Sequence, residues 1–286
     1  LAAYHSYNYL LARENLADHK SLNERANKLR QRLWKIRAKK VILATGAIER
    51  PLIFNNNDRP GIMLANSVKK YIDYFGVRCG NKNVIFTNND SAYETAISLN
   101  KKGINVTIVD IRDSSSSILV KNAKDAGIKI YWNHTVVDTK GYRRVNSIQI
   151  MEMSEDGTNV IGSKINLVCD NLSISGGWTP MAHLFTQSGG KLKFRDSDQV
   201  FLPNTATSDQ INVGSCNGDF ELDDIIKNTI SDCKSFLSSS STDFDLIKVS
   251  CPKQKENKNV WLLPNDKPLG KTCLLYTSPS PRDRSI

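Results

Sequence analysis

The sequence lacks the features that mark several classes of protein. Its longest apolar runs, such as Val41–Ala44, are strand-sized, whereas a membrane-spanning helix needs roughly 18 consecutive apolar residues. None of its six cysteines stands in a Cys-x-x-Cys pair or at metal-ligand spacing from a histidine, which argues against a disulfide framework or structural zinc. The first residues carry neither the basic flank nor the cleavage pattern of a signal peptide. We therefore expect no metal, no membrane contact and a reducing, cytoplasmic location.

The sequence also has no excess of acidic over basic residues. The 286 residues hold 39 Lys and Arg against 29 Asp and Glu, a net charge of +10, and much of the excess lies between Arg13 and Lys40. This basic stretch lacks the interleaved aromatic platforms and the motifs of nucleic-acid binders, so we expect no nucleic-acid partner. The favoured interpretation of the basic stretch is a surface that faces solvent or docks a partner. The alternative is a patch that binds phosphate. The hydrophobic content of 40% is that of an ordinary globular protein.

The two ends do not read as domain ends. Cys273–Asp283 reads CLLYTSPSPRD, which resembles the translation of a sequencing adapter, and its Ser, Pro and Arg show no periodicity. Residues 273–286 are therefore excluded from the fold prediction. The chain begins at Leu1 rather than at a methionine. We expect both ends to be arbitrary and the chain to be a fragment of a longer protein.

The clearest local pattern is a strand, helix and strand between residues 83 and 110. Asn83–Phe86 and Val106–Asp110 are apolar and strand-sized, and Asp90–Asn100 between them has helical spacing. This order predicts parallel strands with a right-handed crossover. Further strands are predicted over residues 32–37, 40–44, 129–132, 136–137, 145–151, 159–168, 172–175 and 210–213, and helices over 66–75, 118–126 and 223–236.

The turn after the first of these strands departs from a dinucleotide fingerprint. That fingerprint needs Gly-x-Gly-x-x-Gly or Gly-x-Gly-x-x-Ala between strand and helix, but here Thr87 and Asn89 replace the first two glycines and Ala92 keeps the last position. Asp110 ends the second strand, where an acidic residue binds a ribose hydroxyl. A structural relic is the favoured interpretation. The alternative is an adapted site in which Asn88 and Asn89 donate hydrogen bonds.

Three strand ends finish in small residues that let a ligand approach the backbone. They are Ala44-Thr45-Gly46, Gly176-Gly177 after residues 172–175, and the stretch from Gly214 to Gly218-Asp219. In parallel sheets, ligands lie outside the carboxyl ends of the strands. The candidate ligand-binding residues are therefore Ala44, Thr45, Gly46, Gly176, Gly177, Gly214, Gly218 and Asp219.

Three long motifs resemble one known family. RLWKIRAKKVILATGAIERPLIFNNNDRPGIMLA at residues 32–65, VIFTNNDSAYETA at 84–96 and SISGGWTPMAHLFTQSGGKLKF at 173–194 resemble the alpha subunit of heterotetrameric sarcosine oxidase. The similarity runs from about Arg32 to about Gly270. The resemblance implies an α/β fold with two Rossmann-like dinucleotide-binding domains, one inserted in the other, with parallel sheets and a small antiparallel layer. The implied domains are 1–75 (partial first FAD/NAD(P)-binding domain without its N-terminal strand), 76–171 (inserted domain) and 172–272 (return to the first domain, and linker).

The resemblance also implies a function. The family oxidatively demethylates sarcosine to glycine and passes the one-carbon unit to tetrahydrofolate, and the flavin is carried mainly by a beta subunit. The alpha subunit binds NAD. Carried over by motif, Ala44, Thr45 and Gly46 line the dinucleotide of the first domain, and Gly214, Gly218 and Asp219 lie near the same cofactor. The implied partners are the beta subunit and smaller subunits of a hetero-oligomer.

Several alternatives stay open at this stage. The enzyme is an opine or other amino-acid oxidase if a partner subunit selects another substrate, or the chain is a non-catalytic scaffold, as the Thr87–Asn89 turn suggests. We expect no catalytic acid or base in this chain. Trp178 packs in the interior or against a flavin, and His183 begins a helix or faces a flavin. Arg50 binds a phosphate or pairs with Glu49.

Overall fold

The chain forms two compact units in a computed structural model, which describes residues 2–4, 7–13, 31–237, 258–260 and 263–267. The flanking unit comprises Leu1–Ala47 and Pro180–Ser250. The inserted unit comprises Ile48–Thr179 and Cys251–Ile286. The second unit therefore interrupts the first in sequence, as one nucleotide-binding domain inserted in another requires.

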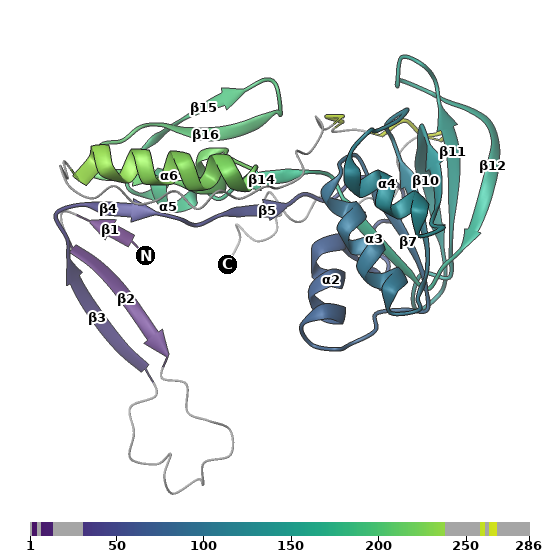
Figure 1. Cartoon of the computed structure of the whole chain (residues 1–286), viewed down its shortest axis with the longest axis horizontal. Helices are drawn as coiled ribbons and strands as arrows, with labels where there is room; N and C mark the ends of the chain where they lie inside the picture. The colour runs from purple at the N-terminus through teal and green to yellow at the C-terminus, as the bar shows by residue number, and fades with distance from the viewer. Residues whose placement is uncertain (1, 5–6, 14–30, 238–257, 261–262, 268–286) are drawn as a thin grey trace, which may run out of the picture. The chain divides into compact units, whose positions relative to one another are not determined.

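The inserted unit is built on a parallel sheet of five strands (Figure 1). Their order is β6 (Ile62–Leu64), β13 (Asn171–Ser175), β7 (Lys82–Thr87), β8 (Asn105–Asp110) and β9 (Lys129–Trp132). Every neighbouring pair is parallel. The carboxyl ends of all five strands therefore meet at one edge, which is where parallel sheets bind ligands.

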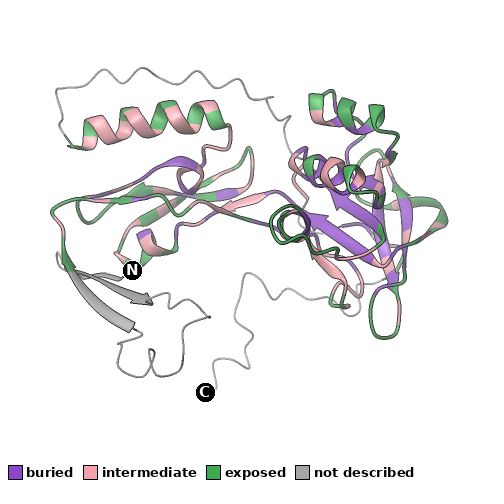
Figure 2. Ribbon diagram, turned by 60° about the horizontal axis from the view of Figure 1, so that its bottom comes forward, coloured by how far each residue is buried: buried purple, intermediate pink, exposed green. Residues whose placement is uncertain are grey.

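Three helices cover one face of this sheet. They are α2 (Ala65–Asp73), α3 (Ser91–Lys101) and α4 (Ile118–Asp125). Side chains alternate between the faces of a strand, so Ile85 of β7 and Ile108 of β8 pack against the apolar sides of these helices. Figure 2 shows the buried residues concentrated in the strands beneath the helices.

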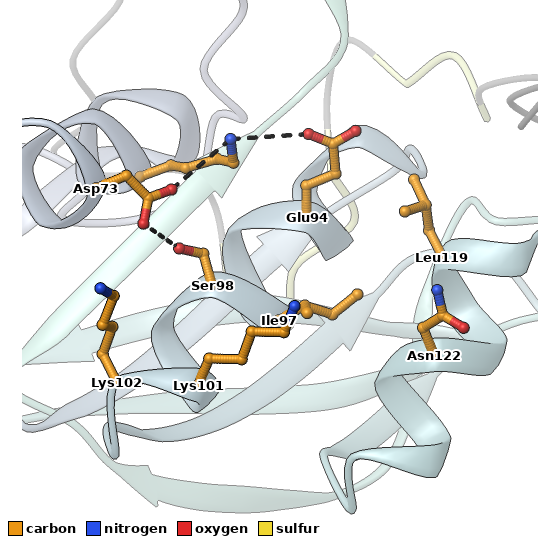
Figure 3. Close-up of a pocket in the computed structure, with 9 residues that line it drawn as sticks. Asp73, Glu94, Ile97, Ser98, Lys101, Lys102, Leu119 and Asn122 are labelled. Carbon is orange, nitrogen blue, oxygen red and sulfur yellow. Dashed lines mark hydrogen bonds and ion pairs between the residues drawn. The ribbon is translucent and has the colours of Figure 1, made fainter. Parts of the chain in front are cut away.

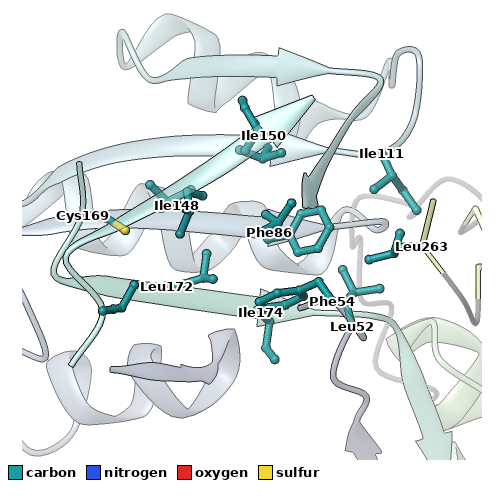
Figure 4. Packing of buried hydrophobic residues seen from close by; sticks show 14 of the residues in the cluster. Leu52, Phe54, Phe86, Ile111, Ile148, Ile150, Cys169, Leu172, Ile174 and Leu263 are labelled. Atoms are coloured by element: carbon teal, nitrogen blue, oxygen red, sulfur yellow. The ribbon is translucent and has the colours of Figure 1, made fainter. Parts of the chain in front are cut away.

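An antiparallel layer covers the opposite face. It consists of β10 (His134–Lys140), β11 (Ser147–Met153) and β12 (Val160–Val168), which pair in chain order. Phe86 points to this side of the sheet and meets Phe54 edge-on, with ring centroids 5.7 Å apart. Figure 4 shows the resulting core between the two layers. Burying several large side chains of this kind stabilises the unit by about 1.5–3 kcal/mol each.

The flanking unit contains two separate sets of strands near its start. Strands β1 (Ala2–Tyr4), β2 (Tyr7–Arg13) and β3 (Gln31–Arg37) form an antiparallel sheet. Strand β4 (Val41–Leu43) pairs in parallel with β17 (Gln210–Asn212), which comes from the far side of the insertion. This pair joins the two sequence segments of the unit.

The rest of the flanking unit follows the insertion. It contains α5 (His183–Gln187), the antiparallel pair β15 (Lys191–Arg195) and β16 (Val200–Thr205), the short 3-10 helix η1 (Gly214–Asn217) and α6 (Leu222–Leu237). The β15–β16 hairpin was not predicted. Helix α6 has an apolar stripe, but none of its residues is fully buried.

The chain passes between the units through β5 (Ala47–Glu49) and β14 (Trp178–Pro180), which pair with each other. The contact-defined boundaries fall inside this pair, at 47/48 and 179/180. The inserted unit therefore begins before the predicted boundary at 75/76 and ends after the predicted boundary at 171/172. The reason is that β6 and β13 hydrogen-bond into its sheet. The family-based domain boundaries stay a prediction.

Candidate functional site

Two of the predicted strand ends meet in the flanking unit. Leu43, the last residue of β4, is aligned with Asn212, the last residue of β17, and the Leu43 carbonyl accepts a hydrogen bond from the amide of Val213 at 2.9 Å. The chain continues from these ends into Ala44-Thr45-Gly46 and into η1, which begins at Gly214. The structure thus brings together two groups of candidate residues that are about 170 positions apart in the sequence.

The loop after β4 is open to a ligand at its glycine. Gly46 has a φ of +76°, a left-handed conformation that favours glycine, and the nearest atom to an added Cβ is Ser215 Oγ at 3.9 Å. Ala44 and Thr45 are exposed. The Thr45 hydroxyl donates to the Met181 carbonyl at 2.6 Å, which orients this loop. Gly46 therefore has the space and backbone conformation that close approach of a ligand needs.

Gly218 has a different role from Gly46. It ends η1 with a φ of +89°, and a Cβ there would lie 2.7 Å from Leu202 Cδ2. Its carbonyl accepts a hydrogen bond from Arg195 Nη2 at 3.0 Å. Gly218 is thus required by packing, whether or not a ligand is bound. Cys216 is also structural, because its buried thiol lies 3.3 Å from the Leu43 carbonyl.

Asp219 supplies the acidic group of this strand end. Its Oδ1 accepts a hydrogen bond from Asn228 Nδ2 of α6 at 3.0 Å. Partial burial raises the pKa of Asp219, and the carboxylates of Asp232 and Asp224 raise it further, while Asn228 and Arg195 lower it. The excess negative charge here disfavours a phosphate. A half-buried carboxylate suits hydrogen bonding to a hydroxyl group.

Gly176 and Gly177 lie in the inserted unit, where they pair with a neighbouring backbone. The Gly176 amide donates to the Arg50 carbonyl at 2.7 Å, and the Arg50 amide donates to the Gly177 carbonyl at 2.8 Å. A Cβ on Gly176 would lie 3.0 Å from the Pro51 carbonyl oxygen. Close backbone packing accounts for this glycine without a cofactor.

The altered turn after β7 is filled by its own side chains. Asn89 Nδ2 donates to the hydroxyl and carbonyl of Ser175 at 3.0 and 3.2 Å, and Asn89 Oδ1 accepts from the amide and hydroxyl of Ser91 at 3.1 and 2.6 Å. Thr87 Oγ1 accepts from the Asn89 amide at 3.1 Å. Thr87, Asn88 and Asn89 are buried. These bonds favour the structural interpretation of the turn.

A buried ionic network lies beside this turn and was not predicted. Arg112 binds Asp110 through Nη2 at 2.7 Å and Asp90 through Nη1 at 2.8 Å. The Tyr93 hydroxyl donates to Asp110 Oδ2 at 2.8 Å, and the Ser115 hydroxyl donates to Asp90 at 3.0 Å. Burial raises the pKa of Asp110, while the bonds from Arg112 and Tyr93 lower it. The only signal in the sequence was an arginine two residues after the acidic strand end.

Glu49 is buried and acts at the start of α2. Its Oε2 accepts a hydrogen bond from the amide of Asn66 at 2.9 Å, in the first turn of the helix. Burial raises the pKa of Glu49, and hydrogen bonds from Ser175 and Asn66 partly offset this rise. A carboxylate from another segment thus satisfies an amide that the helix leaves unpaired.

Trp178 and His183 belong to different units. Trp178 is half-buried, and its Nε1 donates to the hydroxyl of Ser91 at 3.1 Å, at the start of α3. His183 is the first residue of α5, as the structural interpretation predicted, and it is exposed. His134 begins β10 and is half-buried, with its Nδ1 2.6 Å from the Trp132 carbonyl.

One open pocket of about 480 Å³ lies on the helical face of the inserted unit (Figure 3). Three of its charged residues pair with one another, since Lys69 lies 3.8 Å from Asp73 and 3.9 Å from Glu94, and Ser98 donates to Asp73 at 2.5 Å. None of the candidate cofactor residues lines it.

Within the described ranges, no cluster of His, Cys, Asp and Glu is arranged to hold a metal. None of the helices in this part of the chain combines the length and apolar composition that a membrane crossing needs.

Curated proteins of similar sequence share one name. The chain is 37% identical over 216 residues to sarcosine oxidase subunit alpha of Corynebacterium sp. (strain P-1), and 35% identical over 173 residues to that of Rhizobium meliloti (strain 1021). These matches cover 75% and 60% of this chain but 22% and 16% of the relatives. The chain thus spans about a fifth of the length of the relatives it matches. No family model matches it. The predicted resemblance to sarcosine oxidase alpha subunits is confirmed.

Two solved structures of similar fold are reductases. Thioredoxin reductase of T. acidophilum superposes with a TM-score of 0.54 at 18% identity, covering 73% of this chain and 67% of that one. The HOCl-induced flavoprotein disulfide reductase of Escherichia coli gives 0.52 at 16% identity, covering 73% and 46%. At this identity the likeness shows the fold alone. It confirms the predicted α/β class with parallel sheets and a small antiparallel layer.

Proposed function

We infer, from the relatedness of this chain to sarcosine oxidase alpha subunits, that it is the dinucleotide-binding part of such a subunit. The enzyme is then an oxidoreductase that acts on a CH–NH bond and demethylates sarcosine to glycine. The chain binds NAD, while the flavin is carried mainly by a beta subunit. The one-carbon unit passes to tetrahydrofolate in a part of the enzyme outside this chain. The location is cytoplasmic.

The structural observation that supports dinucleotide binding is the parallel pairing of β4 with β17. This pairing sets the open Gly46 loop beside the turn that leads to Asp219, at the carboxyl ends of two strands. Such a strand edge is the usual place for a dinucleotide in this class of fold. Gly46 thus supplies a backbone that a ligand can approach. Asp219, from a distant part of the sequence, supplies a carboxylate that can accept hydrogen bonds from the ligand's hydroxyl groups.

The residues present fit one end of a dinucleotide. Gly46 allows the cofactor to contact the main chain, and Asp219 accepts a hydrogen bond from a ribose hydroxyl. The first turn of α6 carries Asp223 and Asp224, so this helix start is unsuited to a pyrophosphate. The bound cofactor supplies the redox chemistry, and the chain supplies binding and electrostatics. No residue of the chain is assigned the role of a catalytic acid or base.

A scaffold function is the second candidate, and one observation favours it. The turn of the inserted unit is closed by the hydrogen bonds of Asn89, and its strand-end carboxylate is bound by Arg112. The nucleotide-binding fold of the inserted unit thus has a structural role. On the scaffold hypothesis, the fold of the flanking unit has a structural role as well. An opine or other amino-acid oxidase remains the alternative for the substrate.

The experiment that tests the proposal uses the intact protein, purified with its partner subunits. Its absorbance spectrum is recorded before and after sarcosine is added without oxygen, and nucleotide is then released by denaturation. We expect a flavin band that bleaches with sarcosine and the release of NAD. Bleaching only with an opine or another amino acid would change the substrate and keep the role. A colourless complex without nucleotide would overturn the cofactor assignment and support the scaffold.

A further inference from the structure

A distant piece of the chain lies against the altered turn of the inserted unit. The docked segment, defined as residues 258–260 and 263–267, begins at Lys258. The Lys258 amide donates to the Asn88 carbonyl at 3.3 Å, and Asn88 Nδ2 donates to the Lys258 carbonyl at 3.0 Å. The two residues are separated by 170 positions. Asn88 thus holds both the amide and the carbonyl of Lys258, the first through its backbone carbonyl and the second through its side-chain amide.

The side chain of Lys258 reaches the next strand end. Its Nζ donates to the carbonyl of Ile111 at 3.1 Å, one residue beyond Asp110. In a dinucleotide fold this position faces the ribose. Here Lys258 lies at this strand end, and the Asp110 carboxylate is already bound by Arg112 and Tyr93.

The rest of the docked segment is anchored in the core and in the antiparallel layer. Leu263 is 3% exposed and packs in the cluster that contains Phe86, as Figure 4 shows. Asn265 Nδ2 donates to the Val137 carbonyl of β10 at 2.8 Å, and Asp266 forms an ion pair with Lys164 of β12 at 2.6 Å. The segment is therefore held at several points.

We propose that the sheet edge at the carboxyl ends of β7 and β8 is a peptide-docking site, and that its occupant is the docked segment in place of a nucleotide. Asn88 and the Ile111 carbonyl recognise the backbone and the ammonium group of Lys258, and the apolar core receives Leu263. The same edge lacks the glycines that a pyrophosphate needs. The inserted unit thus fixes a remote part of its own polypeptide. This proposal does not depend on cofactor binding in the flanking unit.

Hydrogen exchange on the full chain tests the docking. Lys258→Met removes the bond to Ile111, and Lys267→Met is the matched control, because Lys267 lies in the same segment but is exposed. We expect Lys258→Met to speed exchange of the docked segment about tenfold, since a hydrogen bond to a charged group is lost. Lys267→Met should leave exchange unchanged. Equal exchange in wild type and in Lys258→Met would overturn the proposal.

Two further measurements separate docking from a lid over a working nucleotide site. Asn88→Ala should also speed exchange of the docked segment, although it alters the opposite side of the contact. Millimolar NAD should leave exchange unchanged both in the docked segment and in residues 87–91. If NAD instead releases the segment or protects residues 87–91, this sheet edge binds nucleotide and the proposal is wrong. NAD binding to the flanking unit would alter exchange in other peptides and is distinguished in this way.

Discussion

The guanidinium group of Arg112 lies 2.7 Å from the carboxylate of Asp110, at the end of β8 where a dinucleotide fold presents a free acidic residue to a ribose. Its other terminal nitrogen lies 2.8 Å from Asp90. All three side chains are buried. The acidic residue is therefore still present, but its charge is used inside the protein. The carboxylate thus serves internal packing beside a turn that lacks the nucleotide-binding glycines.

Replacing Arg112 should strongly destabilise the inserted unit. Arg112→Met leaves two buried carboxylates without their cation, which costs about 3–5 kcal/mol in comparable buried networks. The free energy of unfolding, measured with urea at neutral pH, should fall by this amount. The control is Arg143→Met, which removes an exposed arginine and should change stability by less than about 0.5 kcal/mol. Similar small effects of both variants would contradict the buried network.

Glycine at position 89 should destabilise the inserted unit. Asn89→Gly removes the bonds to Ser91 and Ser175 and should cost about 2–3 kcal/mol in unfolding free energy. Asn89→Ala lacks the added backbone freedom of glycine, so a similar loss would identify the side-chain bonds as the cause. Thermal unfolding of both variants makes the comparison. Wild-type stability in Asn89→Gly would show that the bonds contribute little.

Much of the inserted unit was predictable from the sequence because its signals are local. The helix predicted over Asp90–Asn100 forms as Ser91–Lys101, and the strand predicted at residues 129–132 forms with the same bounds. Buried parallel strands read as short apolar runs, and the helices between them show their apolar faces. The β15–β16 hairpin escaped prediction because Phe194 and Phe201 are exposed and its charged residues blur the alternation.

The candidate site was predictable in part. The carboxyl-end rule for parallel sheets grouped three strand ends, and β4 and β17 do bring Gly46 near Gly214. The third end, Gly176-Gly177, belongs to the inserted unit. Cofactor binding by these residues stays a prediction. The contacts of Arg112 and Lys258 were not predictable, because each depends on which buried atoms a long-range fold brings within hydrogen-bonding distance. A charged residue in a sequence does not reveal its partner 147 positions away, as Lys258 and Ile111 illustrate.

Two glycines of the flanking unit should respond differently to alanine. Gly218→Ala forces a Cβ to within 2.7 Å of Leu202 at a φ of +89° and should cost about 2–4 kcal/mol. Gly214→Ala has a similar φ of +71°, but its nearest neighbour is Ile225 Cγ2 at 3.5 Å, so only about 1 kcal/mol is expected. Urea unfolding of the two variants measures the difference. Equal losses of unfolding free energy in the two variants would mean that backbone strain alone, and not the contact with Leu202, sets the cost.

A third glycine separates cofactor binding from stability. Gly46 and Gly103 have φ values of +76° and +73°, and each has room for a Cβ. Alanine at either should cost about 1 kcal/mol. Only Gly46→Ala should weaken NAD binding, on the order of tenfold, because the methyl group occupies space that the cofactor needs. Titration of the intact protein with NAD measures this. Equal affinity in both variants would remove Gly46 from the site.

The buried carboxyl of Glu49 should make stability depend on pH. Burial raises its pKa in the folded state above the ordinary value of about 4.3. The neutral form is therefore favoured by folding, so its contribution is fully present below the ordinary pKa and is lost as the pH rises through the raised one.

Glu49→Gln keeps an oxygen that can accept the Asn66 amide but cannot ionise. Relative to wild type, this variant should gain unfolding free energy as the pH rises from about 4 through the raised pKa, and the gain should level off above it. Urea unfolding of both proteins across this range tests the sign. A gain that instead shrinks with rising pH would mean that the amide of the helix start outweighs burial and stabilises the ionised carboxylate.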